Sequence, residues 1–215
     1  MTTTSGGNLS ILDDNGDIVG EMMCPDLLSF KSWNSKRKLT SKAIFLANFQ
    51  QQPVDVTGAL YAQGFKTYDP LSYDPENAER KLNYTDTADT GADYLCSISF
   101  DEVDGYAYVQ DVYFTDEAME VTEKETARRM KLCGVREAAI ESNNGGRGFA
   151  RNVEKILKGW HWKRTNITWF TQSHNKRARI LSHSTNVLER VIMPEGWEKR
   201  WPEFYKHVMA YQRKN

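Results

Sequence analysis

Two acidic residues, Asp86 and Glu141, stand where strand-like segments end, and their carboxylates are the first candidates for chemistry in this sequence. Glu141 closes the apolar run AAIE, which is typical of a buried strand. An uncompensated buried charge costs roughly 3 to 5 kcal/mol, so we expect Glu141 at the open end of its strand. If the strands that end at Asp86 and Glu141 are neighbours, the two carboxylates can share a divalent cation such as Mg²⁺, which prefers oxygen ligands and keeps several waters.

Asp86 belongs to an acidic cluster, YTDTADTGADYL, that also contains Asp89 and Asp93. The first aspartate closes one strand-like segment and the third opens the next, so their carboxylates can point into solvent beside a sheet. The alternative is a hairpin turn in which Asp and Gly serve only the backbone conformation. Taken by itself, the cluster favours that turn.

The glycine-rich stretch NNGGRG follows Glu141 and contains Arg147. It matches neither G-x-G-x-x-G nor G-x-x-x-x-G-K-[ST], so a nucleotide-binding loop is not indicated. The glycines allow the chain to turn from strand to helix, and free N–H groups at the helix start, with Arg147 beside them, can face a phosphate. A plain strand-to-helix turn with a solvated arginine is an equal alternative.

A basic run, Lys176, Arg177 and Arg179, opens the helical pattern HNKRARILSHSTNVL. Lys176 and Arg179 share one face of such a helix, so this face can contact a phosphodiester backbone. A merely solvated face is the alternative.

The histidines and tryptophans predict no site. The histidines show no ligand spacing and receive no role: His161, His174, His183 and His207. The tryptophans are expected to pack in the core rather than to stack on bases: Trp160, Trp162, Trp169, Trp197 and Trp201.

The net charge of −1 over 215 residues conceals an uneven distribution. Residues 145–215 hold 15 Lys and Arg against 5 Asp and Glu, a net +10, which leaves 13 against 24, a net −11, for residues 1–144. Such segregation suits a protein that holds cations with one part and a polyanion with another, although a helical surface can be basic without a partner. No apolar run approaches the roughly 20 residues that cross a bilayer. The three distant cysteines encode neither a disulfide framework nor a zinc knuckle.

The regular part of the chain predicts an α/β fold with one mixed sheet. Three strand-like segments predict an antiparallel meander, and the strands and helices after it predict parallel crossovers, so helices should cover both faces. Thr122 and Glu125 form a T-x-x-E capping box for the first helix, which Gly134 can end. The expected strands are 81–88, 93–100, 106–114, 137–142 and 166–172, and the expected helices are 122–132, 149–158, 175–190 and 202–213.

The upstream part of the chain is less regular. Residues 1–60 include the turn-rich stretch LDDNGD and a helix-like run from Leu39 to Gln51. Residues 69–80 contain two prolines that disfavour a helix, so we expect a linker there. We therefore place an N-terminal segment at 1–68 and the compact unit at 81–215.

Several of these motifs, in this order, resemble the nuclease part of the large terminase subunit of tailed bacteriophages and prophages. The resemblance rests on YTDTADTGADYLCSISF, YAYVQDVYFTDEAMEVT, IESNNGGRGFARNV, TWFTQSHNKRARIL and MPEGWEKRWPEFYKHVMAYQ. It covers the chain from about Leu82 to its end. Upstream, IFLANFQQQPVDVTGALY resembles the segment that closes the ATPase module of the same family, so residues 1–68 are expected to be the end of that module and its linker.

The resemblance implies an RNase H-like nuclease that cuts concatemeric double-stranded DNA during genome packaging in the cytoplasm of the bacterial host. It also implies two divalent cations, Mg²⁺ or Mn²⁺, about 4 Å apart between carboxylates. Asp86 is carried over as the first catalytic and metal-binding acid, Glu141 as the second and Asp93 as an auxiliary one.

The resemblance also implies partners. Lys176 and Arg179 are carried over as contacts to double-stranded DNA, and Arg147 is a further candidate. In a packaging motor the terminase small subunit and the portal protein would be partners, and no membrane is involved.

Two departures from the family pattern qualify this reading. The third catalytic acid of the family is expected in a D-D-x-x-D-A stretch soon after WPEFY, and the sequence reaches Asn215 without it; Glu189 and Glu203 are the nearest acids. No Walker loop is present, so this chain is not expected to power translocation. One alternative is therefore a catalytically incomplete DNA-binding or assembly remnant. Another is a different RNase H-like enzyme, such as a resolvase or transposase, which would need a third acid in the final helix.

Overall fold

The computed structural model describes residues 9–12, 18–22, 32, 35, 58–87, 94–141, 146–171 and 175–212. The chain divides into two units, residues 1–56 with 181–186, and residues 57–180 with 187–215. In the first unit, β1 (Leu9–Leu12) and β2 (Ile18–Met22) form an antiparallel pair. The helix-like run expected at 39–51 lies outside the described residues.

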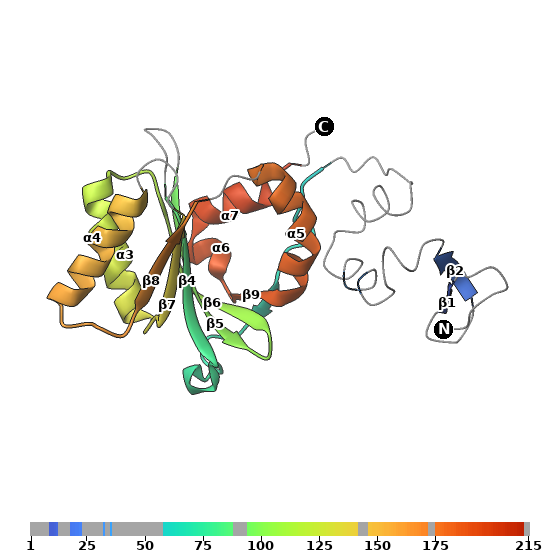
Figure 1. Ribbon diagram of the computed structural model, residues 1–215, viewed down its shortest axis with the longest axis horizontal. Coiled ribbons are helices and arrows are strands. Elements are labelled where there is room, and N and C mark those ends of the chain that lie inside the picture. Colours follow the sequence, from blue (N-terminus) through green and yellow to red (C-terminus); the bar gives the residue numbers. More distant parts are fainter. Residues whose placement is uncertain are drawn as a thin grey trace. The chain divides into compact units, whose positions relative to one another are not determined.

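The second unit is built on a seven-stranded mixed sheet with the strand order β3-β9-β6-β5-β4-β7-β8 (Figure 1). β4, β5 and β6 form the expected antiparallel meander, and β7 and β8 continue the sheet beside β4 as parallel strands. On the other side, β9 runs parallel to β6 and β3. The strands span Lys66–Tyr68 (β3), Arg80–Asp86 (β4), Leu95–Val103 (β5), Tyr106–Thr115 (β6), Glu137–Glu141 (β7), Asn166–Phe170 (β8) and Val191–Pro194 (β9). The predicted α/β fold with one mixed sheet is confirmed.

Helices cover both faces of the sheet, as the sequence predicts. α3 and α4 lie on one face, and α6 and α7 lie on the opposite face (Figure 1). The helices span Met119–Leu132 (α3), Gly146–Gly159 (α4), Lys176–Arg190 (α5), Trp197–Arg200 (α6) and Pro202–Met209 (α7), and a 3-10 turn, η1, spans Pro75–Asn77. Among the described residues, no helix is long and apolar enough to cross a membrane.

Two apolar clusters, one on each face, hold the helices to the sheet. Successive side chains of a strand point to opposite faces, so Val112 of β6 joins one cluster and Tyr113 joins the other. Phe149 and Met130, at 1% and 0% exposed, anchor α4 and α3 on the first face. Each fully buried side chain of this size contributes roughly 1.5 to 3 kcal/mol.

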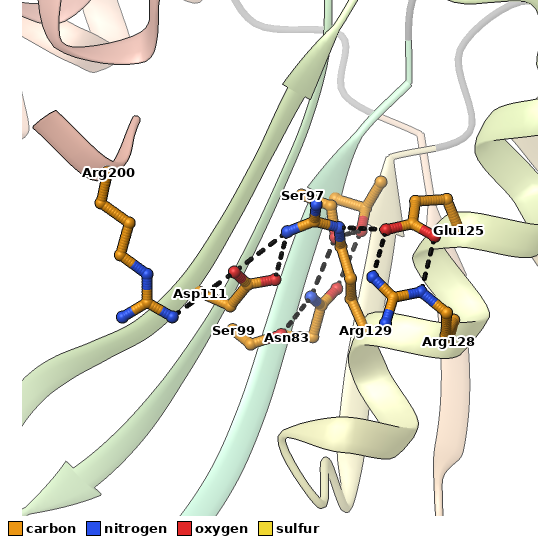
Figure 2. A network of polar contacts seen from close by, with 9 residues as sticks. Asn83, Ser97, Ser99, Asp111, Glu125, Arg128, Arg129 and Arg200 are labelled. Atoms are coloured by element: carbon orange, nitrogen blue, oxygen red, sulfur yellow. Dashed lines mark hydrogen bonds and ion pairs between the residues drawn. The ribbon is translucent and has the colours of Figure 1, made fainter. Parts of the chain in front are cut away.

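A polar layer also lies between α3 and the sheet. Arg129 of α3 donates from Nη1 to both carboxylate oxygens of Asp111 on β6, at 3.0 and 2.9 Å (Figure 2). Nearby, the buried Asn83 amide of β4 donates to the hydroxyls of Ser97 and Ser99 on β5, each at 3.0 Å. Buried polar groups are tolerated only when hydrogen-bonded. The first contact therefore ties α3 to β6, and the Asn83 contacts tie β4 to β5 beneath the helix.

Helix α3 starts one turn earlier than the capping box in the sequence predicts. α3 begins at Met119 with Ala118 as its N-cap, and Thr122 lies buried inside the helix, where its hydroxyl donates to the Met119 carbonyl at 3.1 Å. The predicted capping box is therefore wrong, because Thr122 is buried one turn inside the helix and Glu125 pairs with arginines of the same helix. The predicted end is confirmed, with Gly134 just beyond it at a φ of 65°.

The sheet includes two strands that the sequence did not predict. β3 lies upstream of residue 81, where we expected the compact unit to begin, and β9 follows α5 directly. Both are too short, at three and four residues, for an alternating pattern to be recognised. The start expected at residue 81 is thus too late for the sheet, while the assignment of residues 1–68 to an ATPase-like segment stays a prediction.

The last helix is shorter than expected. α7 ends at Met209, and the chain after it pairs with an upstream segment: the Leu60 N–H donates to the Tyr211 carbonyl at 2.8 Å, and Ala59 and Gln212 form an antiparallel bridge. This pairing takes the backbone groups that a longer helix would need.

Candidate functional site

Asp86 and Glu141 end two adjacent parallel strands side by side. In the register of β4 and β7, Asp86 is the partner of Glu141. The condition on which the predicted site depends, that these two strands are neighbours, is therefore met. Paired residues of neighbouring strands point to the same face of a sheet, so both carboxylates belong to one face at the carboxyl edge.

Glu141 is buried and held by hydrogen bonds. It is 6% exposed, and the Tyr84 hydroxyl donates to its Oε2 at 3.1 Å. The Thr87 hydroxyl donates to the Glu141 carbonyl at 3.0 Å, which ties the end of β7 to the residue that follows β4. Arg179 Nη2 lies 3.9 Å from Oε2 and supplies a positive charge. These contacts explain why a carboxylate is tolerated at the end of a buried strand.

Asp86 has a different neighbour and is more open to solvent. Lys176 Nζ donates to its Oδ2 at 2.6 Å. The Asp86 side chain is 28% exposed and that of Lys176 is 68% exposed. Since an ion pair with so exposed a lysine is weakly held, the Asp86 carboxylate is accessible to another cation.

The first turn of α5 positions Lys176 and Arg179, the two cations beside these carboxylates. Asn175 is the N-cap, and its side chain accepts hydrogen bonds from the N–H groups of Arg177 and Ala178. Lys176 and Arg179, three residues apart, then lie on one face of the helix. That face carries one cation to each of the two carboxylates.

Burial and charge set the protonation of the surrounding groups. Burial, and then the charge of Glu141, raise the pKa of Tyr84 to about 12, so its hydroxyl remains a donor at neutral pH. Burial lowers the pKa of Lys176, but the hydrogen bond to Asp86 and its charge outweigh burial, and the net shift is upward. Burial, with the Asp86 charge, raises the pKa of Cys96 to about 12, so this thiol is no nucleophile at neutral pH.

The family to which the chain belongs follows from its match to a protein-family model. Residues 85–192, which are 108 of the 215, match the family described as Terminase Bacteriophage T7, Ribonuclease H-like domain. The chain belongs to this terminase family. The matched segment includes both carboxylates and all of α5, and the family resemblance predicted from the sequence is confirmed.

Solved structures with similar folds include other terminases. The large terminase of a thermophilic bacteriophage, in complex with ADP, matches with a TM-score of 0.55 and 8% identity over 88% of this chain and 49% of that chain. A mutant nuclease domain of the large terminase subunit gp2 of bacterial virus Sf6, with manganese, gives 0.47 and 15% over 65% and 74%. The human cytomegalovirus terminase nuclease domain, soaked with manganese, gives 0.46 and 9% over 65% and 76%. The first of these shows the fold, and this chain spans about half of its length. A comparison with curated protein sequences finds no match.

The donor set of the terminase domain suits a hard divalent cation. Two carboxylates at paired positions provide the oxygen ligands that Mg²⁺ and Mn²⁺ prefer, and Mg²⁺ needs only one or two carboxylates beside water and phosphate oxygens. Within the described ranges, no group of three or more His, Cys, Asp or Glu side chains gathers to hold a metal ion. Asp89 and Asp93 lie outside those ranges, so Asp93 stays a prediction.

The other sequence candidates lie in different surroundings. Arg147 is exposed in the first turn of α4. Glu203 of α7 pairs with Lys206 at 2.6 Å, and Glu189 accepts a hydrogen bond from Lys66 through its backbone carbonyl. The structure gives neither glutamate a role beside the two carboxylates.

Sequence reasoning missed Tyr84 and Thr87. Tyr84 precedes Asp86 by two residues in a strand, so the alternation of β4 places both on one face and would have been a signal for it. Thr87 carried no such signal, because its partner is a backbone carbonyl of a strand more than 50 residues away.

The tryptophans largely pack as predicted. Trp197 and Trp201 are buried in one apolar cluster, and Trp160 and Trp162 pack against the other. Trp169 is the exception at 40% exposed, because it lies on β8, the strand at the edge of the sheet.

Proposed function

We propose that this terminase domain is a divalent-metal-dependent endonuclease that cuts concatemeric double-stranded DNA during phage genome packaging. The observation that carries the proposal is the pairing of Asp86 with Glu141 at the carboxyl ends of β4 and β7. Membership of the terminase family supports the choice of DNA as substrate and packaging as the setting.

In this proposal Asp86 and Glu141 hold Mg²⁺ or Mn²⁺, with Asp93 as an auxiliary ligand of a two-metal site. A bound ion supplies Lewis-acid chemistry, polarising a phosphodiester oxygen and lowering the pKa of a water nucleophile. Tyr84 orients the Glu141 carboxylate through the hydrogen bond to Oε2. Thr87 holds the backbone of Glu141 in place, so the second ligand is fixed relative to the first.

Lys176 and Arg179 serve two kinds of anion in turn. Without substrate they neutralise the carboxylates, at 2.6 and 3.9 Å. Exposed ion pairs are worth about 0 to 1 kcal/mol, so Lys176 leaves Asp86 at little cost when another cation is present. The released ammonium then contacts a DNA phosphate, as does Arg179 once its carboxylate partner is satisfied. This reconciles the predicted DNA contacts with the ion pairs of the structure.

The setting of the proposal comes from the family. The domain would act in the cytoplasm of the bacterial host beside the terminase small subunit and the portal protein, with Arg147 as a further DNA contact. This chain spans about half of the length of the thermophilic phage terminase.

The test is nicking of supercoiled plasmid by the full chain with Mg²⁺, Mn²⁺ or EDTA. Asp86→Asn keeps the size of the side chain and removes its charge, and Glu203→Gln is the matched control on an exposed carboxylate of α7. We expect metal-dependent nicking by the wild type and the control and its loss in Asp86→Asn. Calorimetric titration with Mn²⁺ provides a second readout and should show weaker binding in Asp86→Asn alone.

Equal nicking by the wild type and Asp86→Asn would remove Asp86 from the mechanism. Salt-sensitive DNA binding with no cleavage by any of the three proteins would instead support the alternative, a non-catalytic DNA-binding or assembly module.

A further inference from the structure

α4 carries a row of exposed cations on the side of the helix away from its buried residues. Phe149, Val153 and other buried residues fix which side of α4 faces the core. Arg147, Arg151 and Lys155, spaced four apart, fall on the opposite side and are all exposed. At a rise of 1.5 Å per residue, successive cations of this row, which we call the α4 stripe, stand about 6 Å apart along the helix axis.

The α4 stripe is not neutralised by its own helix. α4 holds four basic residues and one acid, Glu154, which pairs with Lys158 at 2.7 Å. Within the described part of the chain, none of the three stripe residues forms an ion pair.

The neighbouring helix on the same face shows the contrast. α3 holds four basic residues and three acids, and Arg128 and Arg129 both pair with Glu125 at 2.6 and 2.7 Å. The excess positive charge of this face is therefore concentrated on α4. Glu123 of α3 accepts a hydrogen bond from Asn152 of α4 at 2.9 Å and forms no ion pair with the stripe among the described residues.

The α4 stripe begins near the carboxyl edge of the sheet and is flanked by an exposed aromatic ring. α4 starts five residues after Glu141. Trp169 of β8 is the register partner of Ile140, one residue before Glu141, and Arg151 Cζ lies 6.0 Å from its ring centroid. A ring at this distance favours the guanidinium through a cation–π contact and helps to hold Arg151 at the edge strand.

We infer that the α4 stripe, with Trp169 beside Arg151, binds the phosphodiester backbone of duplex DNA outside the cut site. The inference rests on the proposed function for the identity of the polyanion. Regularly spaced, unpaired Arg and Lys side chains suit a backbone of repeating phosphates, and binding releases its counterions. Because the stripe makes no base contact in this arrangement, it anchors DNA without regard to sequence.

The experiment measures binding of a labelled duplex in EDTA over a series of salt concentrations, so that cutting plays no part. The test variant is Arg147→Gln/Arg151→Gln/Lys155→Gln. The matched control is Arg128→Gln/Lys158→Gln, which removes two cations that already pair with acids of their own helices. All five positions are exposed, and thermal melting checks that every variant remains folded.

We expect the triple variant to bind the duplex about tenfold or more weakly than the wild type. The slope of log K against log salt concentration should become less negative by about 2 to 3 in the triple variant. In the control variant this slope should change by less than about 1. A triple variant with the wild-type slope would overturn the inference. Unchanged DNA binding together with lost binding to an acidic polypeptide would overturn it in favour of a protein partner.

Failure of the proposed function gives a different result. If the site is not catalytic, the wild type does not nick plasmid with any metal, yet the difference in salt slope between the triple variant and the control persists. If only the α4 stripe inference fails, nicking is intact and the slopes coincide.

Discussion

The two ends of the β4 and β7 pair differ in where their counter-charges come from. At the amino end, the strands themselves provide both signs: Arg80 of β4 contacts Glu137 of β7 at 2.8 Å and Glu102 of β5 at 3.2 Å. At the carboxyl end, each strand contributes a carboxylate, Asp86 and Glu141, at paired positions. Their cations come from α5, a separate element.

This difference separates charges that are paired within the sheet from the charges of the proposed metal site. At the amino end, both carboxylates already contact a cation of the sheet itself, Arg80. The carboxyl end holds two like charges side by side, which is unfavourable unless a cation from outside the strands neutralises them. Helix α5 satisfies that need in this structure, and a metal ion would satisfy it in the proposed reaction.

The largest expected effect contrasts two glutamates of β7. Glu141→Gln should lower metal-dependent plasmid nicking by at least about a hundredfold, because a neutral amide is a poor ligand for Mg²⁺. Glu137→Gln, at the other end of the same strand, should nick like the wild type, since its exposed pair with Arg80 is worth little. Comparable losses in both variants would mean that the two ends do not differ in function.

The second-largest expected effect is a loss of stability when Lys81, at the amino end of β4, is replaced. Lys81 donates to the buried carboxylate of Asp101 at 3.2 Å, beside a hydrogen bond from Tyr73 at 3.0 Å. Lys81→Met should lower the free energy of unfolding by about 3 kcal/mol, because it leaves that carboxylate without its cation. Urea denaturation measures the loss, and Lys81→Met/Asp101→Asn should recover much of it. A single variant as stable as the wild type would contradict the structural role of this pair.

A smaller effect is expected when the exposed cation of the carboxyl end is removed. Lys176→Met should bind Mn²⁺ a few-fold more tightly in calorimetric titration, because the ion no longer competes with the ammonium at Asp86. Its free energy of unfolding should change by less than about 1 kcal/mol. The matched variant Arg80→Met should leave Mn²⁺ affinity unchanged. Weaker Mn²⁺ binding in Lys176→Met would show that the lysine supports the site rather than competing for it.

The smallest effect is a dependence of stability on alkaline pH. The pKa of Tyr84 is raised to about 12 in the folded protein, so the folded state favours its protonated form. Its contribution is complete below the ordinary pKa of about 10 and is lost as the pH rises toward 12. Tyr84→Phe has no such proton, so its unfolding free energy should fall less steeply above pH 10. Urea denaturation at several alkaline pH values compares the two slopes, and parallel slopes would rule out the buried hydroxyl as their source.

The fold could be predicted in most of its elements, because they carry local signals. The meander, the buried strand that ends at Glu141 and the helix expected at 175–190 follow from alternation, an apolar run and a helical pattern. Thr122 shows the limit of such signals, since a capping pattern and a buried helical position can have the same residues. β3 and β9 are held by strands distant in sequence, and their own few residues contain no pattern that predicts them.

The sequence by itself determined which acids stand at strand ends and which cations open α5, because those features depend on residues a few positions apart. Only the tertiary structure decided that β4 lies beside β7 and that Asp86 is the partner of Glu141. It also decided that Lys176 and Arg179 face these carboxylates, and that Trp169 and the α4 stripe face solvent. The physical reason is that strand order and helix orientation are set by how crossovers pack their apolar faces over the whole sheet, and no local window of sequence contains that information.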